Sequence, residues 1–248
     1  MRLGRFQADW PRRVLALALA SGMLFVSGCV YLRLLALKNQ LETFDKNFTL
    51  DTSNGLKISC LNPILLPHDF RWLGITPAST KRLGRSEQWH IRWAKEVPAG
   101  SRETSPYSVE IDLFFTENKL TRVVIPERYF AFMSKPFLVG LLRGMGRAEI
   151  NQLKRSADVN FSNANQDILS GRIMAGSLED LLGSPTERRL EGERTLLRYL
   201  FTPTPVGEKS AVFDLLFTFE TASGHLRRID GRSPVGKMSF RFDGAASL

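Results

Sequence analysis

The chain has 248 residues and a formal net charge of +9 at pH 7. This length suffices for one large domain or two small ones. Only two cysteines are present, which excludes a disulfide-rich scaffold and a zinc site built from several cysteines. The excess of basic residues suits an anionic surface, such as phospholipid head groups.

The N-terminus has the three parts of a secretory signal peptide. Four arginines precede an apolar stretch, Val14 to Val26, and small residues then precede a cysteine. The sequence Val26-Ser27-Gly28-Cys29 resembles the lipobox of bacterial lipoproteins. This resemblance implies cleavage between Gly28 and Cys29 and attachment of diacylglycerol to Cys29. Two or three acyl chains would then anchor the protein in a membrane.

An uncleaved signal-anchor helix is the alternative to a lipoprotein. The segment from Val14 to Leu32 is uncharged, and a helix needs about 20 such residues to cross a bilayer. Both interpretations place the basic N-terminus in the cytoplasm and the rest of the chain outside it, where nucleic acid is not an expected partner. The lipobox favours the lipoprotein. Val30, where aspartate commonly signals inner-membrane retention, favours the outer membrane.

Processing would change the charge and the cysteine chemistry of the remaining chain. Loss of residues 1–28 removes four arginines and one aspartate, which lowers the net charge from +9 to +6. Cys60 would then have no disulfide partner. It lies in the alternating run Leu56 to Leu61, which predicts a buried thiol on a strand.

An amphipathic helix is predicted directly after the anchor, from Tyr31 to Phe48. Apolar residues recur at steps of three and four, which is typical of a helix with one buried face. We expect this apolar stripe to pack on the protein's own core rather than on lipid or a partner. The stripe comprises Leu34, Leu37, Leu41, Phe44 and Phe48.

The strongest internal signal is a repeat. Leu73-Gly74-Ile75-Thr76-Pro77 is similar to Leu182-Gly183-Ser184-Pro185, and each proline is followed at the same spacing by an alternating apolar strand. Two further apolar strands with short turns follow in each half. The three residues that correspond in the first of these strands are Trp89 with Leu197, Ile91 with Tyr199, and Trp93 with Phe201.

These patterns predict an α+β fold with two tandem modules behind an N-terminal helix. Each module has helices packed on a three-stranded antiparallel meander. Between the modules, Tyr129–Met145 and Arg147–Ala157 are predicted to be helical. The expected organisation is a signal peptide (1–28), a lipidated cysteine and amphipathic helix (29–50), a first α+β module (51–133), a helical connector (134–160) and a second α+β module (161–248).

The second module resembles the small SmpA/OmlA-type lipoprotein of the outer-membrane β-barrel assembly machinery. The resemblance spans roughly Phe161 to Phe242 and, more faintly, Asp69 to Ile125. It implies two helices packed on a three-stranded antiparallel sheet, and it concerns the fold rather than binding residues. It is carried by Ser177–Pro185, Leu197–Tyr199, Phe217–Phe219 and Gly224–Leu226.

No pattern in the sequence predicts catalysis, a metal or a cofactor. The three histidines, His68, His90 and His225, lack the spacing of a zinc site. The nucleophile elbow fails at its last position in Gly231–Val235, and no glycine-rich dinucleotide loop follows a strand. We therefore expect a protein that is not an enzyme.

Three basic clusters form a candidate interaction surface for anionic lipid head groups or an acidic partner, although a solvated face would have the same composition. The expected function is a lipid-anchored, non-catalytic binding or assembly module, facing the periplasm, with a protein partner in the cell envelope. The alternative is a carrier or sensor of an apolar or lipid ligand between the two modules, which predicts a continuous apolar cavity. The clusters comprise Lys81, Arg82, Arg85, Arg188, Arg189, Arg227 and Arg228.

Overall fold

The computed structural model describes residues 30–98, 100, 107–131, 133–161, 173–204 and 212–242. Strands predominate. They are β1 (Phe48–Asp51), β2 (Leu56–Cys60), β3 (Ser79–Leu83), β4 (Ser86–Lys95), β5 (Ser108–Thr116), β6 (Lys119–Ile125), β7 (Glu149–Asn151), β8 (Ser156–Asn160), β9 (Glu187–Glu191), β10 (Arg194–Pro203), β11 (Phe213–Glu220), β12 (Leu226–Ser233) and β13 (Gly236–Arg241). A helix covers residues 30–42. The shorter helical elements are α2 (Phe44–Asn47), α3 (Pro67–Trp72), η1 (Glu127–Ala131), α4 (Lys135–Met145) and α6 (Ala175–Leu182).

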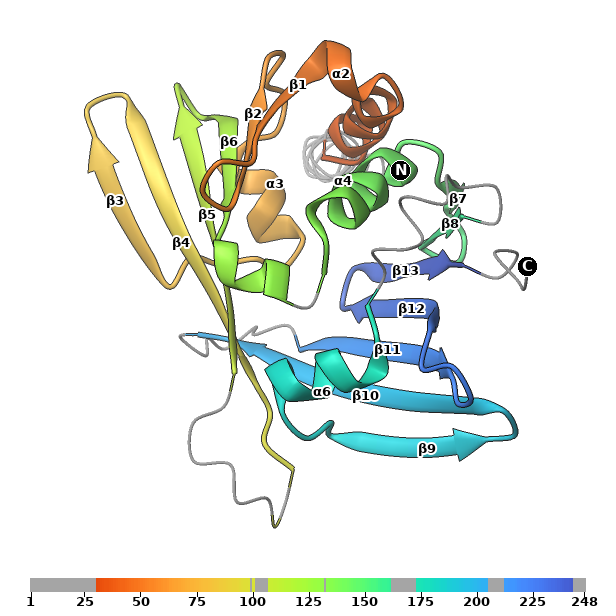
Figure 1. Cartoon of the computed structure of the whole chain (residues 1–248). Helices are drawn as coiled ribbons and strands as arrows, with labels where there is room; N and C mark the ends of the chain where they lie inside the picture. Colours follow the sequence, from red (N-terminus) through yellow and green to blue (C-terminus); the bar gives the residue numbers. More distant parts are fainter. Residues whose placement is uncertain are drawn as a thin grey trace, which may run out of the picture.

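All thirteen strands belong to one sheet (Figure 1). Its order is β1-β2-β6-β5-β4-β10-β11-β12-β13-β8-β7, with β3 paired to β4 and β9 paired to β10. Paired strands are antiparallel throughout, apart from the parallel pair of β13 with β8. Figure 1 shows the strands of the two halves running in different directions, with α3 and α4 between them.

The predicted fold class is therefore wrong: the two halves are not separate helix-on-meander modules behind an N-terminal helix. β4 and β10 are each longer than the hairpin partner beside them. β3 pairs only with Ser86–His90, and β9 pairs only with Arg194–Arg198. The uncovered ends of β4 and β10 pair with each other, which satisfies their backbone groups and joins the halves into one sheet.

The predicted helix Arg147–Ala157 is also wrong, because this segment contains the antiparallel hairpin of β7 and β8. A polar turn interrupts it: Asn151 Oδ1 accepts a hydrogen bond of 3.0 Å from Lys154 N, and Arg155 has a φ of 47°. Asparagine side chains that bond to a nearby backbone group stabilise turns at the expense of helix. β8 then adds to the sheet beside β13.

The sequence repeat corresponds to a repeated pattern of strand pairing inside the one sheet. Each residue of β3 and β4 has a counterpart 108 positions later in β9 and β10, as Ser79 has in Glu187 and Ser86 in Arg194. The hairpin turns match too, with a φ of 62° at Gly84 and 58° at Gly192. A register shift occurs at equivalent points of the next ladder, between Phe114 and Phe115 in β5 and between Thr218 and Phe219 in β11.

The two halves meet around an approximate two-fold axis at the junction of β4 with β10. Trp93 pairs with Pro203, Ala94 with Thr202, and Lys95 with Phe201. In the repeat, whose offset is 108 residues, Trp93 corresponds to Phe201 and Lys95 to Pro203. Exchanging the two halves therefore turns the first pair into the third and leaves the middle pair unchanged. Two backbone hydrogen bonds flank these pairs in the same symmetric way. Glu96 N donates to Leu200 O at 2.8 Å, and Thr204 N donates to Arg92 O at 2.9 Å.

One face of the sheet carries the core. The repeat-related residues of β4 and β10 are buried on this face, namely Trp89, Ile91, Leu197 and Tyr199. α6 and α4 pack on the core of the second half through Leu178, Leu182 and Phe137, as part of one apolar cluster. The core of the first half is covered by α3 and helix 30–42 through Phe70, Leu34 and Leu37.

The apolar stripe of the N-terminal helix packs on the protein's own core, as predicted. Leu41 and Phe44 form a cluster with β1, β2 and α4, and Phe48, predicted as the last residue of the helix, joins the same cluster as the first residue of β1. The helix approaches the end of α4 closely, because a methyl group at Gly146 would lie 2.2 Å from Glu42 N. Arg33 adds a polar contact, donating from Nε and Nη2 to both carboxylate oxygens of buried Asp69 at 2.8 and 2.5 Å.

Candidate interaction edge and open face

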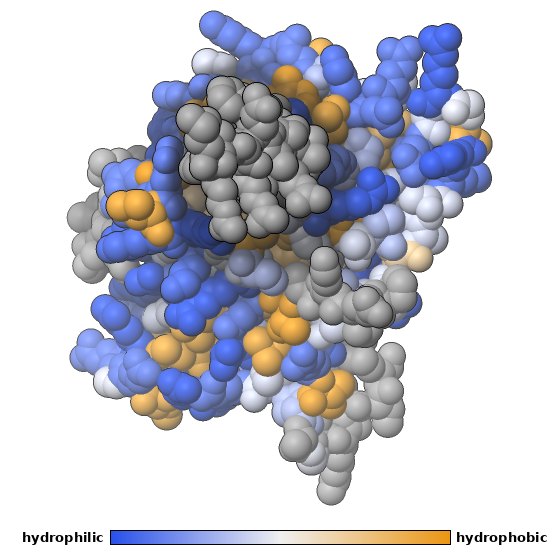
Figure 2. Space-filling model, turned by 180° about the vertical axis from the view of Figure 1, so that it is seen from behind, coloured by the Kyte–Doolittle hydropathy of each residue, from blue (hydrophilic) through white to orange (hydrophobic). Residues whose placement is uncertain are grey.

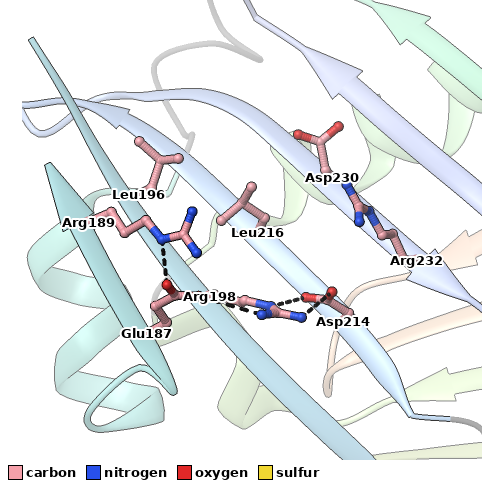
Figure 3. Close-up of a pocket in the computed structure, with 8 residues that line it drawn as sticks. All are labelled: Glu187, Arg189, Leu196, Arg198, Asp214, Leu216, Asp230 and Arg232. Carbon is pink, nitrogen blue, oxygen red and sulfur yellow. Dashed lines mark hydrogen bonds and ion pairs between the residues drawn. The ribbon is translucent and has the colours of Figure 1, made fainter. Parts of the chain in front are cut away.

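The face of the sheet opposite the core is polar. In Figure 2, which shows this side of the second half in its lower part, hydrophilic residues predominate and apolar patches are separate. A shallow pocket on this face is lined by six charged residues and two leucines (Figure 3). They are Glu187 and Arg189 from β9, Leu196 and Arg198 from β10, Asp214 and Leu216 from β11, and Asp230 and Arg232 from β12.

Charges of opposite sign neutralise each other across this pocket. Arg198 Nε and Nη2 each donate to Asp214 at 2.9 Å, and Arg198 Nη1 lies 3.5 Å from Glu187 Oε2. Arg189 donates to Glu187 as well. This hydrogen bond lowers the pKa of Glu187, while the hydrogen bond to Asp214 raises the pKa of Arg198. The groups are therefore held in their charged forms, in a network that leaves little uncompensated charge for an anionic ligand.

The described residues offer no group of three or more histidine, cysteine or carboxylate side chains that could hold a metal ion. His90 Nδ1 lies 3.0 Å from Asp112 Oδ1 in a surface pair, on the polar face of β4. Among the helices in the described ranges, none has the length and apolar character to cross a membrane. Cys29, the Gly28–Cys29 cleavage site and the signal peptide lie outside the described residues.

Five of the seven basic residues in the candidate interaction surface form ion pairs with nearby carboxylates. The distances are 3.0 Å from Arg85 to Glu117, 2.6 Å from Arg227 to Glu220 and 2.7 Å from Arg228 to Asp230. Such exposed pairs contribute little stability, but they reduce the charge available to a partner. The remaining two of these five pairs join Arg188 to Glu179 and Arg189 to Glu187.

Lys81 and Arg82 differ from the other five. Within the part of the chain that the structure describes, neither side chain forms a hydrogen bond or ion pair. Both are on β3, whose five residues are all exposed. The seven residues thus lie on β3, β9, β12 and the β3–β4 turn, and only Lys81 and Arg82 combine free charge with an exposed strand edge.

Among the described residues, β3 has one paired edge and one free edge. Its paired edge contacts β4, and the free edge is at the far left of Figure 1. A turn of two residues, Gly84 and Arg85, places the turn hydrogen bond between Leu83 and Ser86. Because bonded and non-bonded pairs alternate along an antiparallel ladder, the backbone N–H and C=O groups of Thr80 and Arg82 point to the free edge.

The sequence interpretation did not predict β3 or β9. All residues of β3 are exposed, and so are all residues of β9 after Glu187, so neither strand has the apolar alternation by which strands are recognised in a sequence. Gly84 and Gly192, seven residues after their prolines, were the available signal, because glycine with positive φ in a two-residue turn is typical of a hairpin.

Comparison with protein-family models, with curated proteins and with solved structures finds no match to this chain. The function must therefore be argued from the chain's own residues.

Cys60 provides a first prediction. It is the last residue of β2 and is half-buried, and burial raises the pKa of its thiol to about 11. The reactive thiolate is then a very small fraction at neutral pH. Alkylation by iodoacetamide, followed by mass spectrometry, should be slow in the folded protein and fast in guanidinium. Rapid labelling of the folded protein at neutral pH would contradict the burial described.

Proposed function

We propose that this chain is a lipid-anchored protein of the bacterial cell envelope, in the outer membrane, which acts as a non-catalytic binding or assembly module facing the periplasm. The observation that carries the binding role is the free, cationic edge of β3. The anchor is supported by the lipobox resemblance at Val26–Cys29. Helix 30–42 lies between the proposed lipid anchor and the folded body that carries the β3 edge.

Helix 30–42 would hold the folded body close to the membrane. Its described part starts at residue 30, directly after Cys29 in the sequence, and its core contacts and the Arg33–Asp69 ion pair fix it to the rest of the protein. No flexible tether separates the proposed lipid from this helix. A partner that binds β3 would therefore be recruited near the membrane surface rather than at the end of a long linker.

The pocket on the open face of the second half does not suit the apolar ligand of a carrier. A carrier of an apolar ligand needs a mostly apolar cavity with few polar groups. The pocket on the open face has six charged residues among its eight lining residues. Its arginines and carboxylates would lose hydration on contact with an acyl chain, and this loss opposes binding.

Replacing Cys29 with alanine tests the anchor. Without the thiol no thioether to diacylglycerol can form, so labelling by a fatty-acid analogue should disappear. The protein should then be found unprocessed or in the soluble fraction. A Cys60→Ala variant, with the other cysteine removed, should keep both the label and the membrane fraction. If Cys29→Ala stays in membranes with unchanged mobility, the chain is held by an uncleaved helix instead.

Affinity capture from detergent-solubilised membranes tests the binding role. A tagged chain should retain one or more envelope proteins that a tagged control lipoprotein does not. The proposed function is contradicted if the tagged chain captures no protein beyond those captured by the control, and if a deletion strain also has unaltered growth and envelope integrity.

A further inference from the structure

We propose that the free edge of β3 binds an extended, acidic segment of a partner protein as an added strand. This inference rests on the proposed binding function and names the chemistry of the partner. Strand addition to an exposed sheet edge is a recurrent mode of peptide recognition, in which main-chain hydrogen bonds supply affinity and side chains supply selectivity.

The backbone of β3 is available for this pairing. Thr80 and Arg82 direct their N–H and C=O groups away from β4, and all the β3 side chains are exposed. Unpaired groups of this kind are a ready template for another chain. The uncovered end of β4 is paired with β10 across the junction, so on this side of β4 the template consists of the five residues of β3.

The side chains of β3 select an acidic occupant. Lys81 lies opposite Gln88 and Arg82 opposite Glu87, so the two cations are on opposite faces of the sheet. Neither forms an ion pair with a described residue. Carboxylates directly opposite them on an added strand would make attractive cross-strand pairs on both faces. Leu83, which is 59% exposed, would contact an apolar side chain beyond them.

A second copy of β3 does not fit this edge as well. Lysine on an edge strand disfavours pairing with an identical strand, because like charges directly opposite are destabilising. The repeat-related strand β9 is also less suitable. Its arginines are already paired with Glu179 and Glu187, and it carries glutamates at both ends. The two edges therefore share geometry but differ in free charge.

The proposal predicts a short sequence pattern in the partner segment. Two consecutive acidic residues would place one carboxylate on each face, opposite Lys81 and Arg82. An apolar residue next to the acidic pair would lie opposite Leu83. Because a strand can add in either direction, a probe needs an apolar residue on both sides of the acidic pair.

The test uses the detergent-solubilised full-length chain and a fluorescein-labelled peptide, Ser-Thr-Val-Glu-Glu-Val-Thr-Ser. Fluorescence anisotropy at low ionic strength should show binding about tenfold tighter than to the twin peptide with Lys-Lys in place of Glu-Glu. In Lys81→Glu/Arg82→Glu this preference should reverse, because the attractive cross-strand pairs become repulsive. If the acidic and basic peptides bind the unaltered chain equally, the proposal is overturned.

A proline pair separates strand addition from simple charge attraction. Thr80→Pro removes an N–H that points to the free edge, where an edge strand tolerates proline. It should weaken binding of the acidic peptide about tenfold, with Lys81 and Arg82 intact. Arg188→Pro, at the equivalent position of β9, is the matched control and should leave binding unchanged. Equal losses in the two variants would place the peptide elsewhere and overturn the assignment to β3.

Melting temperatures of all variants establish that each is folded. Binding to vesicles of anionic phospholipid distinguishes the other ligand class. If Lys81→Glu/Arg82→Glu abolishes binding of both peptide and vesicles while Thr80→Pro binds both normally, the cations contact lipid head groups and strand addition is wrong. If membrane capture still yields a partner in that case, the proposed binding function stands and only the β3 edge is overturned.

Discussion

Truncating Phe219 to alanine should lower the free energy of unfolding by about 3–5 kcal/mol, a typical loss for a buried phenylalanine. Phe219 is fully buried, and its ring stacks on Phe217 with centroids 6.4 Å apart. It belongs to the apolar cluster under α6, so the ring's removal leaves a cavity lined by apolar side chains. For a chain of this size the melting temperature should fall by roughly 6–20 °C in thermal unfolding followed by circular dichroism.

The repeat supplies a second variant for this measurement. Phe115 is the counterpart of Phe219 at the register shift of β5, and it is 1% exposed. Phe115→Ala should therefore give a loss in the same range. Arg188→Ala removes only an exposed ion pair with Glu179 and should change stability by less than about 1 kcal/mol. A silent Phe219→Ala would contradict the core described under α6.

Replacing Asp69 with alanine should also be strongly destabilising, by about 3 kcal/mol. The Asp69 side chain is 1% exposed and accepts hydrogen bonds from Arg33 and from Leu66 N. Its removal leaves the Arg33 guanidinium without its carboxylate and the start of α3 without its cap. We place the loss at the lower end of the range for a broken buried pair, because Arg33 is 26% exposed. Urea unfolding measures it.

Two controls distinguish this ion pair from an ordinary surface pair. Asp45→Ala removes the partner of Arg143 in an exposed pair and should cost less than about 1 kcal/mol. Limited proteolysis should cut helix 30–42 faster in Asp69→Ala, because Arg33 is one of its links to α3. If Asp69→Ala unfolds at the same urea concentration as the unaltered chain, the ion pair does not hold the helix.

Sequence patterns predicted the apolar strands because burial of one face is a local signal. Trp89 and Ile91 recur with Leu197 and Tyr199 at equal spacing, and all four are buried in the structure. The same reasoning placed the stripe of the N-terminal helix on the core. In each case the spacing of the apolar residues, alternate in a strand and three to four in a helix, indicates which face of the element is buried.

The fold class was not predicted because it depends on a contact between distant segments. The junction of β4 with β10 consists of three residue pairs. The local sequence around these residues does not indicate which distant segment they pair with. The error at Arg147–Ala157 has a different cause. Its short strands are stabilised by the turn at Asn151 and by β13, while its residue composition alone also suits a helix.

The candidate site was predicted only as a set of basic residues. The sequence identified Lys81 and Arg82 together with five other cations, but it could not show which of them face a carboxylate. That distinction depends on carboxylates from other elements, such as Glu220 of β11 beside Arg227 and Glu179 of α6 beside Arg188, which come together only when the chain folds. The free backbone edge at Thr80 has no side-chain signal at all.

The junction between β4 and β10 has a consequence for refolding at high concentration. The approximate two-fold axis of the junction exchanges Trp93 with Phe201 and Lys95 with Pro203. The two paired segments are therefore equivalent positions of the repeat. A molecule whose junction opens exposes two edges that fit a second molecule as well as they fit each other. Domain-swapped dimers, with β4 of one copy paired to β10 of the other, are therefore the expected by-product of concentrated refolding.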